Sequence, residues 1–131
     1  MGGAFSPDGR KLAFTAFDLK LSTKGPSKGT YTSDPAKLYV LDLDSGVAAV
    51  PLLNRNNMGE AQNSSLGFRE PSWSPDGTYI VFSARGGKSN KPPCGSGNTD
   101  IFIIRSDGTG QATSLTRTDT TSKEQWPQWG W

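Results

Sequence analysis

The sequence predicts an all-β fold made of many short strands, and three observations support that prediction. Hydrophobic residues make up only 33% of the 131 residues, while the chain contains 16 glycines and 9 prolines, a composition that favours strands and turns over long helices. No stretch has the apolar periodicity of an extended helix. A strand–turn–strand unit occurs at residues 71–83 and recurs in related form at residues 4–15.

The first unit reads as four strands in succession. They are expected at residues 2–6, 11–17, 37–43 and 47–53. The first two are joined by Pro7-Asp8-Gly9, whose residues favour a tight turn. Residues 18–36 are expected to form a long loop, with a small hairpin around Gly29. Pro51 indicates that the fourth strand lies at a sheet edge, because proline cannot donate a ladder hydrogen bond.

The second unit repeats this order after a loop at residues 54–70. Its strands are expected at residues 71–74, 79–84, 100–106 and 111–116, separated by the Pro75-Asp76-Gly77 turn, a loop at 85–99 and the Asp107-Gly108 turn. After a loop at 117–125, residues 126–131 repeat the front of the unit. Long repeats of four short strands are typical of β-propeller blades. We therefore expect one domain over residues 1–131, with blade 1 at about 2–53, blade 2 at about 71–116 and a partial inner strand at 126–131.

These segments resemble the TolB-type β-propeller repeat, a relative of the WD repeat. The resemblance rests on Phe5-Ser6-Pro7-Asp8-Gly9, on Pro71-Ser72-Trp73-Ser74-Pro75-Asp76-Gly77 and on the strand segments that follow each of them. It implies antiparallel four-stranded blades around a central channel, usually about six or more in a ring. It also implies a periplasmic or extracellular location, since many relatives are exported binding proteins and others are propeller domains attached to serine peptidases. The sequence itself leaves the compartment unknown.

The residue types present argue against several kinds of chemistry. The chain has no histidine and one cysteine, so Ser-His-Asp catalysis and a zinc site of Cys and His ligands cannot be built from it. We expect no cofactor and no metal. The residues favour a protein that is not an enzyme, although paired carboxylates in the long loops leave that question open. The formal charge is only +2 with scattered lysines and arginines, which predicts no nucleic-acid partner. No apolar run is long enough to predict insertion into a membrane.

Two blades leave apolar faces without neighbours, so the sequence predicts self-assembly. A heterologous contact between copies can close into a ring, and a cyclic trimer or tetramer would provide six or eight blades. The aromatic residues expected at the junctions occupy the repeat motif and the end of the chain: Phe5, Trp73, Trp129 and Trp131.

Antiparallel blades place the four long loops on one face of the ring, where they can form a site without disturbing the strands. The residues proposed to contact a protein or carbohydrate ligand there are Tyr31, Glu70, Arg85 and Trp126. The expected function is a non-catalytic module that self-assembles and binds a protein or small ligand through this long-loop face. Two alternatives remain open: a fragment of a larger propeller-containing peptidase or carbohydrate-active enzyme, and a purely structural ring protein.

Overall fold

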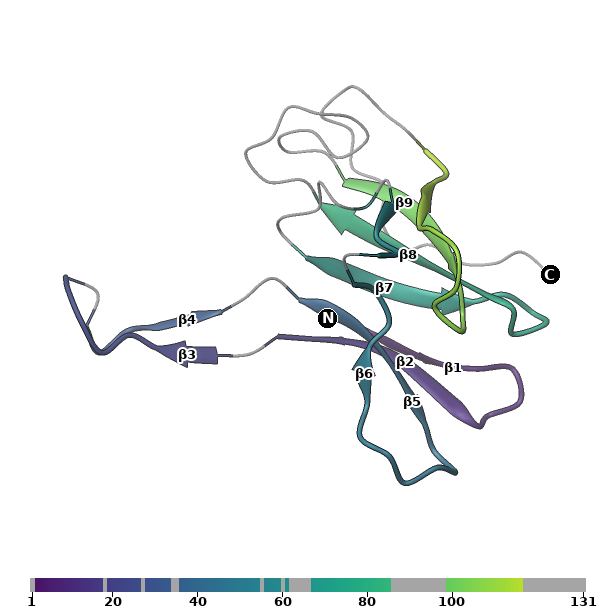
Figure 1. Cartoon of the computed structure of the whole chain (residues 1–131), viewed down its shortest axis with the longest axis horizontal. Helices are drawn as coiled ribbons and strands as arrows, with labels where there is room; N and C mark the ends of the chain where they lie inside the picture. Colours follow the sequence, from purple (N-terminus) through teal and green to yellow (C-terminus); the bar gives the residue numbers. More distant parts are fainter. Residues whose placement is uncertain are drawn as a thin grey trace.

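A computed structural model of the chain describes residues 2–17, 19–26, 28–33, 36–54, 56–59, 61, 67–85 and 99–116. These residues form strands and turns without an α-helix (Figure 1). The first sheet has four antiparallel strands: β1 (Gly3–Phe5), β2 (Lys11–Ala16), β5 (Lys37–Asp42) and β6 (Val50–Pro51). Edge strand β6 contains Pro51, as the sequence predicts.

The second sheet repeats the same antiparallel order. It consists of β7 (Phe68–Trp73), β8 (Tyr79–Arg85), β9 (Thr99–Arg105) and β10 (Thr113–Ser114). In each sheet every strand pairs with the next one along the chain, apart from the hairpin inserted between β2 and β5. That succession is the strand order of a propeller blade, so the predicted all-β fold with two four-stranded blades is confirmed. We call the first sheet blade 1 and the second blade 2.

A separate hairpin extends from blade 1. It is formed by β3 (Leu19–Leu21) and β4 (Tyr31–Ser33), which pair with each other in a two-stranded sheet. Ser22 and Gly29 close its tip through two backbone hydrogen bonds, in which Ser22 donates to Thr30 and Gly29 donates to Ser22. This confirms the hairpin expected around Gly29. In Figure 1 the hairpin, which we call the arm, projects to the left beyond both blades.

The inner strand of blade 2 differs from the sequence prediction. β7 begins at Phe68, where a loop was expected up to residue 70. The additional strand residues, Phe68 to Glu70, follow Gly67, whose positive φ of 95° brings the backbone against Ala36. The amide of Phe68 then donates to the Ala36 carbonyl at 3.0 Å. A Cβ at position 67 would lie 2.6 Å from the Ala36 nitrogen, so only glycine fits there. A register shift between Arg69 and Ser72 accommodates Pro71.

The core lies between the blades. Blade 2 contributes the large side chains, and blade 1 contributes small or aliphatic ones, with Ala13 and Leu38 completely buried. Trp73 crosses the junction, and its indole Nε1 donates to the Ala4 carbonyl at 2.9 Å. The described part of the chain contains no helix that could span a membrane.

Candidate functional site

The turn aspartates of both blades have the same local geometry. In blade 1 the Ser6 hydroxyl donates to Asp8 at 2.6 Å and accepts from the Lys11 amide at 3.0 Å. In blade 2 the Ser74 hydroxyl donates to Asp76 at 2.7 Å and accepts from the Tyr79 amide at 2.9 Å. Each serine and aspartate therefore closes its own turn, as expected for turn residues.

These hydrogen bonds keep the turn carboxylates ionised. The Ser6 hydroxyl and then the Arg10 amide lower the pKa of Asp8 below its ordinary value of 3.8. The Ser74 hydroxyl and the Thr78 amide do the same to the pKa of Asp76. Hydrogen bonds to the charged form favour that form, so the short-turn end of the molecule stays anionic at neutral pH.

This lowering predicts an acid-labile fold. Because the folded pKa values of Asp8 and Asp76 lie below 3.8, these carboxylates stabilise the fold above that pH and lose their contribution as the pH falls further. We expect the free energy of unfolding by urea to be level from neutral pH to about 5 and to fall below about 4. The double variant Asp8→Asn with Asp76→Asn keeps an acceptor oxygen that does not titrate. It should lose less stability on acidification, and an unchanged pH profile in this variant would contradict the prediction.

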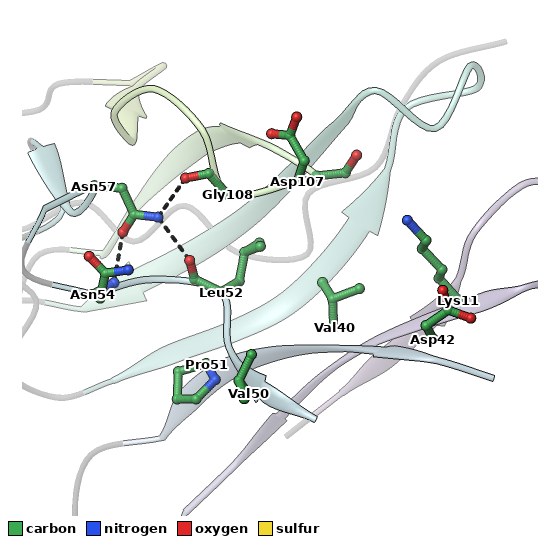
Figure 2. Close-up of a pocket in the computed structure, with 11 residues that line it drawn as sticks. Lys11, Val40, Asp42, Val50, Pro51, Leu52, Asn54, Asn57, Asp107 and Gly108 are labelled. Carbon is green, nitrogen blue, oxygen red and sulfur yellow. Dashed lines mark hydrogen bonds between the residues drawn. The ribbon is translucent and has the colours of Figure 1, made fainter. Parts of the chain in front are cut away.

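A cleft of about 380 Å³ lies between the blades at the short-turn end (Figure 2). Blade 1 supplies its apolar wall, formed by Val40, Val50 and Pro51, and blade 2 closes it with the β9–β10 turn. Leu52, which follows β6, also lines the cleft, and the remaining lining residues are polar or belong to the β9–β10 turn: Lys11, Asp42, Asn54, Asn57, Ser106, Asp107 and Gly108. This volume lies within the range of small-ligand pockets.

Asn57 fixes the shape of the cleft. Figure 2 shows its side chain between the two blades, where Nδ2 donates at 2.8 Å to the carbonyls of both Leu52 and Gly108. Its Oδ1 accepts from the Asn54 amide at 2.7 Å. Asn57 is buried, and all its amide atoms are engaged by the scaffold. Its role is therefore to position the connection between the blades, and the ligand-facing groups are the exposed carboxylates and the apolar wall.

The charged groups of the cleft suit binding better than bond cleavage. Lys11 and Asp42 are directly opposite partners in the β2–β5 ladder, so a cation and an anion neighbour each other at the mouth. The Thr109 hydroxyl and amide lower the pKa of Asp107, which keeps that carboxylate charged. A general acid needs a raised pKa, so Asp107 is better suited to attracting a cationic group than to donating a proton. Among the described residues, no group of three or more Asp, Glu or Cys side chains is arranged to hold a metal ion.

The residues proposed for ligand binding do not form one cluster. Tyr31 lies on the arm with 68% of its surface exposed, while Glu70 and Arg85 lie on blade 2. Glu70 has a positive φ of 54° at the β7 register shift, and its Oε2 accepts from the Ser83 hydroxyl at 2.6 Å. Arg85 is half-buried at the end of β8, with its backbone amide donating to the Gly67 carbonyl. Trp126 lies outside the described residues.

A second candidate surface is the face of blade 1 that points away from blade 2. Five apolar side chains lie on it in ladder register: Phe5, Leu12, Phe14, Tyr39 and Leu41. Phe14 and Tyr39 stack with ring centroids 5.3 Å apart. Phe5 is 64% exposed, and the other four are half-buried. We call this surface the outer face of blade 1.

Blade 2 shows what such a face looks like when a neighbouring blade covers it. The residues at the same five ladder positions are Trp73, Ile80, Phe82, Phe102 and Ile104. Their exposed fractions are 7%, 0%, 0%, 0% and 2%, because blade 1 packs on them. The two predicted assembly residues within the described chain therefore differ in environment, since Trp73 is buried and its counterpart Phe5 is exposed. Trp129 and Trp131 lie outside the described residues.

Sequence reasoning predicted Phe5 and Trp73 as residues of these faces but missed the cleft. Asn57 lies in a segment expected only to be a loop, and Asp42 and Lys11 lie at strand ends. The sequence signal available was the repetition of aspartate in every short turn. That signal indicates an acidic end but cannot place the apolar wall beside it.

The comparisons with known proteins support the same fold. The chain is similar to the crystal structure of TolB from Acinetobacter baumannii, with 22% identity and a TM-score of 0.52 over 88% of this chain. The matched region is 21% of the TolB chain, so this sequence spans about a fifth of that protein. No family model and no curated protein matches the chain. The likeness establishes a TolB-like β-propeller fold for this segment.

Proposed function

We propose that this chain is a non-catalytic β-propeller unit that assembles with further copies of itself and binds a partner through its long-loop face. The self-assembly part of this proposal rests on the difference in burial between the equivalent faces of blade 1 and blade 2. Phe82 is completely buried beneath blade 1, whereas Phe14, at the same position of blade 1, remains half-buried with its stacked partner Tyr39. An apolar face that is covered in one blade and uncovered in the other is suited to accept a further blade.

The chain itself carries a surface of the kind that this face accepts. Ala13, Leu38 and Val40 form the side of blade 1 that packs on blade 2. Val81, Ile101 and Ile103 occupy the equivalent ladder positions on blade 2. Blade 2 of one copy can therefore pack on the outer face of blade 1 in the next copy through a heterologous contact. Three or four copies would close into a ring of six or eight blades.

The mass of the chain in solution tests this assembly. Light scattering after size exclusion should give a discrete multiple of the 14.0 kDa chain mass. Phe14→Asp places a charge in the outer face and should weaken association by about 30-fold or more, since a buried aromatic contributes roughly 2 kcal/mol. Val47→Asp is the matched control because Val47 is 67% exposed outside that face. The proposal fails if the unchanged chain is a monomer, or if both variants weaken association equally.

The binding half of the proposal rests on the arm. It leaves blade 1 between β2 and β5, at the end where the long connections lie. On the arm, 51% of the surface of Leu21 and 68% of the surface of Tyr31 are exposed. An arm that is uncovered and carries an aromatic side chain is suited to protein recognition. The alternative, a segment of a larger propeller-containing protein, is favoured by the 21% coverage of TolB, and a monomeric chain that binds no second copy would support it.

A further inference from the structure

The arm has no covering surface among the described residues of the chain. Its two strands pair only with each other, and Leu21 lies directly across from Tyr31 in the ladder. Both side chains are more than half exposed. A two-stranded hairpin is marginally stable in water unless further strands or an apolar surface support it. We therefore expect the arm to be stabilised by packing against another surface.

The charge of the arm identifies the chemistry of that surface. Residues 19–33 include Lys20, Lys24 and Lys28 and no acidic residue. Lys24 and Lys28 are exposed near the tip. The tip itself, between residues 22 and 30, is polar, and Leu21 and Tyr31 form the last ladder pair before it. A hairpin that enters a membrane would need its apolar side chains at the tip, so a carboxylate-bearing protein surface fits better.

The opposite end of the molecule offers such a surface. The four short turns and their adjoining strand ends carry five aspartates against three basic residues: Asp8, Asp42, Asp44, Asp76 and Asp107 against Arg10, Lys11 and Arg105. The cleft opens at this end, and Asp42 and Asp107 line it together with the apolar wall of Val40, Val50 and Pro51 (Figure 2). It thus combines an apolar wall with anionic groups, as the arm combines an apolar pair with cations.

We propose that the arm of one copy docks in the cleft of a second copy. Leu21 and Tyr31 pack on Val50 and Pro51, while the arm lysines lie beside the carboxylates of the short-turn end. The cleft volume of about 380 Å³ suits a pair of side chains of this size. The arm projects from the long-loop end and the cleft lies at the short-turn end, so the contact joins copies head to tail. This inference rests on the proposed function in taking the arm as the binding element, and it names the partner of that element.

Charge reversal with cross-rescue tests the contact. Variant one carries Lys24→Glu and Lys28→Glu on the arm, and variant two carries Asp42→Lys and Asp44→Lys at the short-turn end. Sedimentation velocity at 50 mM NaCl should show about 30-fold weaker head-to-tail association for each variant alone, because two attractive charge pairs become repulsive. An equimolar mixture should recover association, since each variant then meets an oppositely charged partner surface. Circular dichroism and thermal melting should show that both variants fold.

The outcomes separate this contact from the contact between blades. Head-to-tail association should weaken markedly at 500 mM NaCl, whereas the blade contact, being apolar, should not. Phe14→Asp removes only the blade contact, so it should leave the salt-sensitive association intact even if the ring proposal fails. A mixture that associates no better than either variant alone overturns the inference. A second result would also overturn the inference. It is that the unchanged chain binds phosphatidylserine vesicles, and that variant one loses this binding but keeps its self-association.

Discussion

Replacing Phe82 with alanine is expected to lower the free energy of unfolding by about 3–5 kcal/mol, the cost usual for a fully buried phenylalanine. Phe82 has no exposed surface and lies between two other rings. Its centroid is 5.3 Å from that of Phe68, edge to face, and 5.8 Å from that of Phe102, stacked. Removing it creates a cavity in the core between the blades, and urea unfolding followed by circular dichroism measures the loss of free energy.

Phe14→Ala is the matched control for this prediction, because the repeat places Phe14 at the position of Phe82. Phe14 is half-buried and stacks on a single ring, that of Tyr39. At protein concentrations where only single copies are present, its loss should cost roughly 1 kcal/mol, the value of an aromatic pair. Equal losses for Phe82→Ala and Phe14→Ala would contradict the interpretation that blade 1 covers one face and leaves the other uncovered.

Trp73→Ala is expected to uncouple the two blades as well as destabilise the chain by about 3–5 kcal/mol. Trp73 is 7% exposed, and its indole is the side chain that crosses to the Ala4 carbonyl. Blade 1 contributes few large buried side chains of its own, so it should unfold first once this contact is lost. Hydrogen exchange at the β1 and β2 amides should accelerate more than exchange in β8 and β9.

Trp73→Phe separates the hydrogen bond from the packing. Phenylalanine retains most of the apolar contact but cannot donate to Ala4, so the loss should be about 1–2 kcal/mol. The amides of β1 should then remain protected. If Trp73→Ala accelerated exchange uniformly in both blades, the indole would be a general core residue and its specific role in joining the blades would be refuted.

The turns and their positions could be predicted from the sequence because their causes are local. A serine two residues before an aspartate, followed by glycine, closes on itself through hydrogen bonds that need no other part of the chain. The edge position of Pro51 was likewise predictable, since the missing amide is a property of that residue alone. The hairpin at Gly29 was also predictable from residues close together in the sequence.

The cleft and the start of β7 depend on residues far apart in sequence. Asn57 reaches the Gly108 carbonyl across 51 positions, and Gly67 is required because Ala36 lies against it. An asparagine in a polar loop and a glycine after a serine-rich stretch look ordinary in the sequence. Only their contacts show that one positions the blade connection and that the other permits close backbone approach.

The sequence by itself determined the positions of most strands, the short turns and the repetition of one blade by the other. Only the tertiary structure decided which apolar faces are buried. Phe14 and Phe82 have the same local pattern and the same ladder position, yet one is half-buried and the other has no exposed surface. The physical reason is that strand alternation assigns a side chain to a face of the sheet, whereas burial depends on whether another sheet lies against that face.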